Sequence, residues 1–126
     1  MIVADTDVLI DFLADRGPAA GRVAVELQSR SFGTTAVTRF ELLAGAQDRT
    51  GESLLRRLLD PLPTLPLDRE SADRAAAVRR TLEGRGQGIG MGDSLIAGIV
   101  LAHDGILLTR NRRHFERVDG LKLASL

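Results

Sequence analysis

The chain has 126 residues, of which 44% are hydrophobic and 27% are charged, which is the composition of an ordinary globular domain. Its 17 basic and 17 acidic side chains balance, which excludes a histone-like protein that binds nucleic acid through its overall charge. Cysteine is absent, so disulfide scaffolds, cysteine nucleophiles and thiolate zinc sites are excluded together.

These features predict one cytoplasmic domain that spans residues 1–126. The start of the chain shows no basic segment before an apolar run, so no targeting segment is expected. The longest strongly apolar stretch, Leu95 to Ala102, is too short to cross a bilayer. No membrane partner is therefore expected.

The first half of the chain alternates apolar runs of strand length with segments of helical periodicity. The predicted strands are Ile2 to Ala4 and Ser31 to Thr34. The predicted helices run from Asp5 to Gly17, from Pro18 to Arg30, from Ala36 to Gln47 and from Glu52 to Asp60. The three prolines of the following segment, Pro61, Pro63 and Pro66, allow only a short strand at a sheet edge.

The second half of the chain contains the most apolar predicted helix, Asp93 to His103. Because it is apolar on all sides, we expect it to be central and buried, and Gly105 lies where a left-handed cap would close it. An earlier helix, capped by Asp68, extends to Glu83. The remaining predicted elements are a glycine-rich loop at 84–92, a strand at 106–108, a helical turn at 111–115 and a strand at 121–124.

Strands that alternate with helices predict an α/β fold, with a short central parallel sheet flanked by helices on both faces. In such a sheet, ligand sites lie beyond the carboxyl ends of the strands. Three acidic residues can reach that edge: Asp5 closes the first strand, Asp93 opens the buried helix, and Glu41 lies at the margin of an apolar helical stripe.

A carboxylate at the margin of an apolar stripe is costly to desolvate, and a divalent ion held by several carboxylates is one way to compensate. Each residue also has a plainer interpretation. Asp5 and Asp93 could be helix N-caps, and Glu41 could be an ordinary solvated side chain. The hypothesis of a metal site therefore depends on the three residues as a set.

Four segments then carry a family resemblance: IVADTDVLI at 2–10, TRFEL at 38–42, GDSLIA at 92–97 and LLTRNRRHF at 107–115. Their order and spacing resemble the PIN-domain ribonucleases, specifically the VapC-type toxins of toxin–antitoxin pairs. The resemblance covers nearly the whole chain, which implies a single PIN domain with a PIN-like fold. It also implies a toxin that arrests growth by cleaving RNA.

The resemblance implies a metal-dependent endoribonuclease whose carboxylates Asp5, Glu41 and Asp93 bind Mg²⁺, for which Mn²⁺ can substitute. A metal-activated water would attack phosphorus, and the family implies 5′-phosphate and 3′-hydroxyl products. Thr109 falls where the family has a hydroxyl that supports the site. Asn111 stands where the family often has a fourth carboxylate, so we do not expect a second metal ion.

Four arginines flank these segments and are expected to bind RNA phosphates: Arg39, Arg110, Arg112 and Arg113. The alternative for each is a solvated surface charge. His103 and His114 are interpreted as structural or surface residues. Base stacking is not expected, because tryptophan and tyrosine are absent and the four phenylalanines mostly have the spacing of core residues, namely Phe12, Phe32, Phe40 and Phe115.

The resemblance also implies a partner, a small cognate antitoxin whose tail sets an arginine or lysine against the carboxylates. It implies a homodimer or a toxin–antitoxin hetero-oligomer. The sequence specifies neither the antitoxin nor the RNA that is cleaved.

Two other functions remain open at this point. A phosphoryl-transfer protein of the haloacid-dehalogenase or receiver type would use Asp5 as its nucleophile, but its required lysine is poorly matched by Lys122, and Leu9 stands where threonine or valine is expected. A non-catalytic PIN-like interaction module would lack the acidic centre. The three carboxylates argue against such a module, whereas Asn111 keeps it open.

Overall fold

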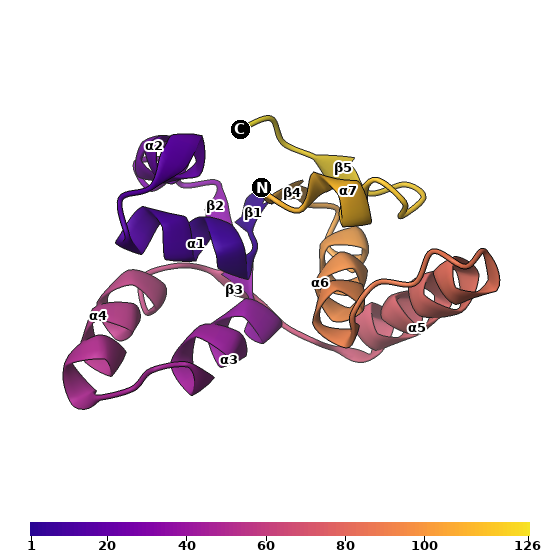
Figure 1. Cartoon of the computed structure of the whole chain (residues 1–126), viewed down its shortest axis with the longest axis horizontal. Helices are drawn as coiled ribbons and strands as arrows, with labels where there is room; N and C mark the ends of the chain where they lie inside the picture. The colour runs from indigo at the N-terminus through magenta and orange to yellow at the C-terminus, as the bar shows by residue number, and fades with distance from the viewer.

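Five parallel strands form one sheet in the computed structural model, which describes residues 1–126. The strand order is β3-β2-β1-β4-β5, so β1 lies at the centre (Figure 1). The strands are β1 (Ile2–Ala4), β2 (Phe32–Thr35), β3 (Thr64–Leu65), β4 (Ile106–Leu108) and β5 (Lys122–Leu123). The helices are α1 (Thr6–Leu13), α2 (Gly17–Glu26), α3 (Ala36–Ala44), α4 (Arg49–Leu59), α5 (Arg69–Gly84), α6 (Met91–Ala102) and α7 (Arg112–Phe115).

Helices cover both faces of the sheet, which confirms the predicted α/β architecture. Because successive side chains of a strand point to opposite faces, Val3 packs with α5, α6 and α7, whereas Ala4 packs with α1 to α4. Figure 1 shows α5 and α6 on one side of the sheet and α1 to α4 on the other. Each strand is short. Its side chains pack into two hydrophobic cores, one on each face of the sheet, and this packing supplies most of its stabilisation.

The edge strand β3 was correctly predicted from its prolines. It pairs only with β2, through Thr64 and Leu65. Phe40, by contrast, was wrongly predicted as a core residue. Helix α3 buries Thr38 and Leu42, which lie one turn apart, so Phe40 between them faces outward and is 70% exposed.

Among the helix boundaries that differ from the prediction, two lie where side chains compete for backbone groups. The Asp48 carboxylate accepts a hydrogen bond from the Gly51 amide at 2.7 Å, so α4 begins at Arg49 rather than at Glu52. The Ser29 hydroxyl accepts one from the Ser31 amide, and α2 has already ended by that turn. Helices α1 and α3 also end before their predicted boundaries, at Leu13 and Ala44.

Helix α6 is the buried central helix that its composition predicted, with six of its twelve residues buried. It begins at Met91 with Gly90 as its N-cap, so Asp93 lies inside the first turn and is not a cap. Neither α6 nor any other helix combines the length and the apolar character needed to cross a membrane.

The predicted left-handed cap at Gly105 is wrong. The residue with positive φ is Asp104, at +51°, a conformation that aspartate tolerates better than most residues. Gly105 is needed for a different reason, because a Cβ there would lie 2.9 Å from Cγ2 of Val3 in the central strand. The glycine therefore permits close packing of the α6–β4 connection against β1.

Close backbone approach also explains how α5 and α6 pack. A Cβ on Gly98 would lie 2.5 Å from the Ser71 carbonyl oxygen and 2.6 Å from Cβ of Ala75. The two helices therefore meet at a point where only glycine fits. Gly21, on the exposed face of α2, has no atom within 4 Å of such a Cβ.

We predict that Gly98→Ala lowers the free energy of unfolding by about 1–3 kcal/mol, because the added methyl group overpacks the α5–α6 contact. The matched variant Gly21→Ala should raise it by about 0.5–1 kcal/mol, since alanine favours an exposed helix. Urea unfolding of both variants measures these changes. Equal effects of the two substitutions would contradict the proposed contact.

Candidate active site

The centre of the candidate site is the Asp5 carboxylate, which directly follows the central strand β1. It caps α1 by accepting a hydrogen bond from the Val8 amide at 3.3 Å, and it accepts a second from the Thr109 hydroxyl beyond β4. Asp5 is 4% exposed and Thr109 is fully buried. Asp5 is therefore a helix cap, and this role is compatible with a role in the candidate site.

Burial raises the pKa of the Asp5 carboxyl to about 7. Desolvation is the main cause, because a buried carboxylate loses its hydration. The Thr109 hydrogen bond and the Val8 amide lower the pKa, whereas the negative charges of Asp7 and Asp93 raise it further. The two hydrogen bonds of Asp5 therefore offset the desolvation and the nearby negative charges only in part.

Glu41 lies where α1, α3 and α6 meet. The Thr6 hydroxyl donates a hydrogen bond to Oε1 of Glu41 at 2.6 Å, and its oxygen lies 3.2 Å from the Thr38 hydroxyl oxygen. A Cβ on Gly92 would lie 3.0 Å from Oε2 of Glu41, so glycine at the start of α6 leaves room for the carboxylate. The side chain is exposed at this junction and is held by a neutral donor.

Asp93 projects from the first turn of α6 toward α7. The Asn111 side-chain amide donates to Oδ2 of Asp93 at 3.3 Å, and Nδ1 of His114 lies 3.5 Å from the same oxygen. Nδ2 of Asn111 and Nδ1 of His114 are 2.8 Å apart. The Asn111 backbone amide in turn donates to the Thr109 hydroxyl at 2.9 Å, which links this group to Asp5.

Sequence reasoning missed three polar neighbours of the carboxylates: Thr6, Asp7 and His114. Thr6 and Asp7 directly follow Asp5, but their side-chain directions depend on how α1 packs. His114 had a detectable signal, because it lies three residues after Asn111 in a predicted helical turn. It was interpreted as a structural or surface residue, and the structure places its ring beside Asp93.

The donor chemistry of this edge fits a divalent cation. Mg²⁺ prefers carboxylate oxygens, and Asp5, Asp7 and Glu41 have no cationic side chain within salt-bridge distance. Among the candidate carboxylates, Asp93 alone has a basic side chain nearby, the His114 ring, which is a cation only when it is protonated. The carboxylates do not converge on one point, however, since no three acidic or histidine side chains are close enough together to hold an ion.

The four predicted RNA-binding arginines differ in their surroundings. Arg39 pairs with Asp60 at 2.9 Å, Arg110 pairs with Asp11 at 2.7 Å, and Arg112 lies 3.7 Å from Glu116. Arg113 is exposed and has no acidic partner. Three of the four therefore have a carboxylate of their own chain as a partner.

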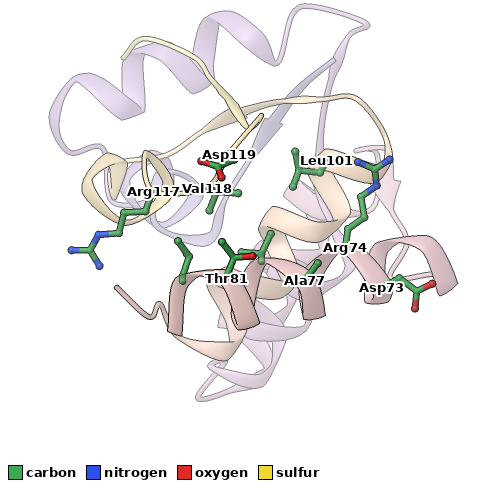
Figure 2. A pocket seen from close by; sticks show the side chains of 10 residues that line it. Asp73, Arg74, Ala77, Thr81, Leu101, Arg117, Val118 and Asp119 are labelled. Carbon is green, nitrogen blue, oxygen red and sulfur yellow. The ribbon is translucent and has the colours of Figure 1, made fainter. Parts of the chain in front are cut away.

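A separate cavity of about 360 Å³ lies between α5 and the segment 117–119 (Figure 2). Leu82, Leu101 and Val118 contribute to its apolar wall. Figure 2 shows Asp73 and Arg117 directed away from it at its two ends. None of the candidate site residues lines this cavity, so it is not part of the carboxylate site.

Comparisons with known proteins bear on the family and the fold of the chain. The PIN-domain family model matches residues 2–121. The tRNA(fMet)-specific endonuclease VapC of Shigella flexneri is 29% identical over 122 residues, which cover 94% of this chain and 92% of that protein. The protein of the same name from Salmonella typhimurium is 25% identical over 123 residues, with the same coverage.

Two solved structures show the same fold. VapBC2 from Rickettsia felis, bound to a DNA fragment from its promoter, superposes with a TM-score of 0.87 at 21% identity, covering 100% of this chain and 99% of that chain. DNA-bound VapBC from Salmonella typhimurium gives a TM-score of 0.82 at 21% identity, covering 98% and 96% of the two chains.

The raised pKa of Asp5 predicts how stability depends on pH without added metal. The folded chain keeps a proton on Asp5 up to about pH 7, whereas the unfolded chain releases it near 3.8. The free energy of unfolding should therefore fall as pH rises between these values, by an amount on the order of 4 kcal/mol.

Asp5→Asn should remove most of this dependence and raise the melting temperature at pH 8 in the presence of a chelator, with little change at pH 5. Asp73→Asn, at an exposed position on α5, serves as the control and should leave the pH dependence unchanged. Thermal unfolding across pH measures both. A stability of Asp5→Asn below that of the parent at pH 8 would contradict the burial argument.

Proposed function

Because the chain belongs to the PIN-domain family, we propose that it is a metal-dependent endoribonuclease and the toxin of a toxin–antitoxin pair. One observation carries the proposal: Asp5, Glu41 and Asp93 gather at the carboxyl edge of the sheet without an arginine or lysine partner. Because both relatives are tRNA(fMet)-specific endonucleases, tRNA(fMet) is the first substrate to test.

Asp5, Glu41 and Asp93 would hold Mg²⁺, or Mn²⁺ in its place, once their side chains turn toward one another, because in the structure they are not close enough together to surround an ion. When bound, the ion would supply positive charge to the phosphate and lower the pKa of a water molecule. Each carboxylate is held by a neutral donor, namely Thr109 on Asp5, Thr6 on Glu41 and the Asn111 amide on Asp93. These donors fix the acidic oxygens and bring no positive charge to them, so a cation remains the expected partner.

The reaction that follows is hydrolysis of an RNA phosphodiester. Water adds to phosphorus, the bond to the 3′ oxygen breaks, and the products carry a 5′-phosphate and a 3′-hydroxyl. Among the four predicted RNA-binding arginines, Arg113 is exposed without an acidic partner and is the one most available to a phosphate. Arg39, Arg110 and Arg112 would share their donors between RNA and their acidic partners.

The phosphoryl-transfer alternative gains no support from the structure. It requires a lysine beside the Asp5 carboxylate. Lys122 instead opens β5, and its Nζ lies 3.9 Å from Asp104, which precedes β4 at the amino edge of the parallel sheet. Asp5 follows β1 at the carboxyl edge, so the only lysine of the chain is at the wrong end of the strands.

We predict that the purified protein cleaves RNA only with Mg²⁺ or Mn²⁺, and that Asp5→Ala and Asp93→Ala each reduce cleavage at least 100-fold while the protein stays folded. Loss of a carboxylate removes both a metal ligand and negative charge from the site. Cleavage of tRNA and of unstructured RNA, followed on gels with circular dichroism as the folding control, tests this. Activity that survives exhaustive chelation would refute the assignment.

We also propose that the antitoxin tail occupies a groove beside Glu41. The groove, of about 400 Å³, is bounded by α1, α3 and α4, and its apolar lining includes Ile10, Leu13 and Leu55. Ile10 and Leu13 are 39% and 43% exposed. The groove ends at Thr6 and Glu41, so a tail with apolar anchors could place a basic residue against this exposed carboxylate.

Leu13→Glu should therefore weaken inhibition by the cognate antitoxin at least tenfold, because it places a charge in the apolar groove. Val25→Glu, on an exposed part of α2 that does not line the groove, is the matched control and should be inhibited as strongly as the parent protein. Cleavage rates are measured against partner concentration. Identical inhibition curves for the two variants would show that the partner binds elsewhere.

A further inference from the structure

A second charged pocket lies beside the carboxylate site, between the end of α1, the start of α2 and the residue that follows Thr109. It has a volume of about 320 Å³ and is lined by Asp11, Arg16, Gly17, Pro18, Ala19 and Arg110. Of these residues, only Arg110 was predicted to bind RNA. We call this feature the Arg16–Arg110 pocket.

Two arginines share one buried carboxylate in this pocket. Nε of Arg110 lies 2.7 Å from Oδ2 of Asp11, and Nη2 of Arg16 lies 3.6 Å from Oδ1. Asp11 is 5% exposed, whereas the side chains of Arg16 and Arg110 are 64% and 51% exposed. The buried acid therefore anchors two guanidinium groups that remain open to solvent, and one positive charge is left uncompensated.

Most of the hydrogen-bonding capacity of the two arginines is also unused. Each guanidinium has five N–H donors in a planar fork that matches phosphate oxygens. Asp11 offers only two oxygens to the pair. Helix α2 begins on the pocket wall without a side-chain cap, so the positive end of its dipole adds to the field of the arginines. The helix start alone would not make a site.

The pocket lies within reach of a strand bound at the carboxylates. Arg110 directly follows Thr109, whose hydroxyl donates to Asp5. Asp11 lies six residues beyond Asp5 on α1, which corresponds to roughly 9 Å along the helix axis. A polynucleotide carries a phosphate at every nucleotide, so a strand centred on Asp5 passes a neighbouring phosphate through this region.

We propose that the Arg16–Arg110 pocket binds a backbone phosphate of the RNA, next to the phosphodiester that is cleaved at Asp5. This inference rests on the proposed ribonuclease function. Asp11 has two effects: it holds both guanidinium groups in place, and it competes with the phosphate for their donors. Removal of the arginines and removal of the acid should therefore change RNA binding in opposite directions.

The test measures binding without cleavage. A fluorescein-labelled single-stranded RNA oligonucleotide is titrated with protein carrying Asp5→Asn in the presence of a chelator, and fluorescence anisotropy is recorded at several salt concentrations. We expect Arg16→Gln combined with Arg110→Gln to weaken binding about tenfold. The slope of log Kd against log salt should fall by about 0.7, the value for one phosphate contact on a single strand.

Two further variants keep the test specific. Asp11→Asn should tighten binding a few-fold, because both guanidinium groups are then free for the phosphate. Arg79→Gln is the matched control, since Arg79 is also half exposed and pairs with Glu83 at 2.9 Å, but on α5. Arg16→Glu alone, at the more exposed position, should weaken binding even if the double variant does not fold.

An unchanged salt slope in the arginine variants, or weaker binding by Asp11→Asn, would overturn the proposal. If RNA binding is unaffected while the arginine variants lose affinity for the antitoxin, the pocket serves an acidic segment of that protein instead, which also overturns it. Cleavage by the parent protein is measured separately. If the parent does not cleave RNA, the ribonuclease function is refuted. If the parent cleaves RNA and the pocket variants bind RNA normally, only the proposed role of the pocket is refuted.

Discussion

Burial of one carboxylate at the end of the central strand organises the rest of the site. Asp5 must accept hydrogen bonds where β1 ends, because it is almost fully removed from solvent. The Val8 amide and the Thr109 hydroxyl meet this need, and they tie the start of α1 to the segment after β4. The remaining electrostatic cost appears as the raised pKa of Asp5, which favours anything that brings positive charge to the edge.

The chain separates its charges in a consistent way. Around the carboxylates these hydrogen-bond donors are neutral hydroxyls and an amide, so they bring no positive charge to the edge. Two of the arginines that flank the site are paired with other carboxylates: Arg110 with Asp11, and Arg39 with Asp60. A negative centre with positive groups at its border suits a cation at the centre and a polyanion across it.

Local patterns in the sequence predicted most elements because periodicity and caps act over a few residues. The strand before Asp5, the cap at Asp68 and the proline-limited edge strand are of this kind. Errors arose where a choice depended on distant atoms. Gly105 was assigned the left-handed conformation that Asp104 adopts, because only contact with Val3 shows why residue 105 must be glycine. Phe40 was assigned to the core because its helix face could not be fixed from spacing alone.

The sequence by itself determined the α/β class and the order of the elements. It also indicated Asp5, Glu41 and Asp93 as candidate site residues, because Asp5 ends a strand, Asp93 opens a helix and Glu41 lies at the margin of an apolar helical stripe. Only the tertiary structure decided what each side chain meets. His114 lies beside Asp93, and Arg16 and Arg110 converge on Asp11, across separations of 21, 5 and 99 residues. The contact of Arg110 with Asp11, like that of Thr109 with Asp5, depends on the pairing of β1 with β4, which sequence spacing does not encode.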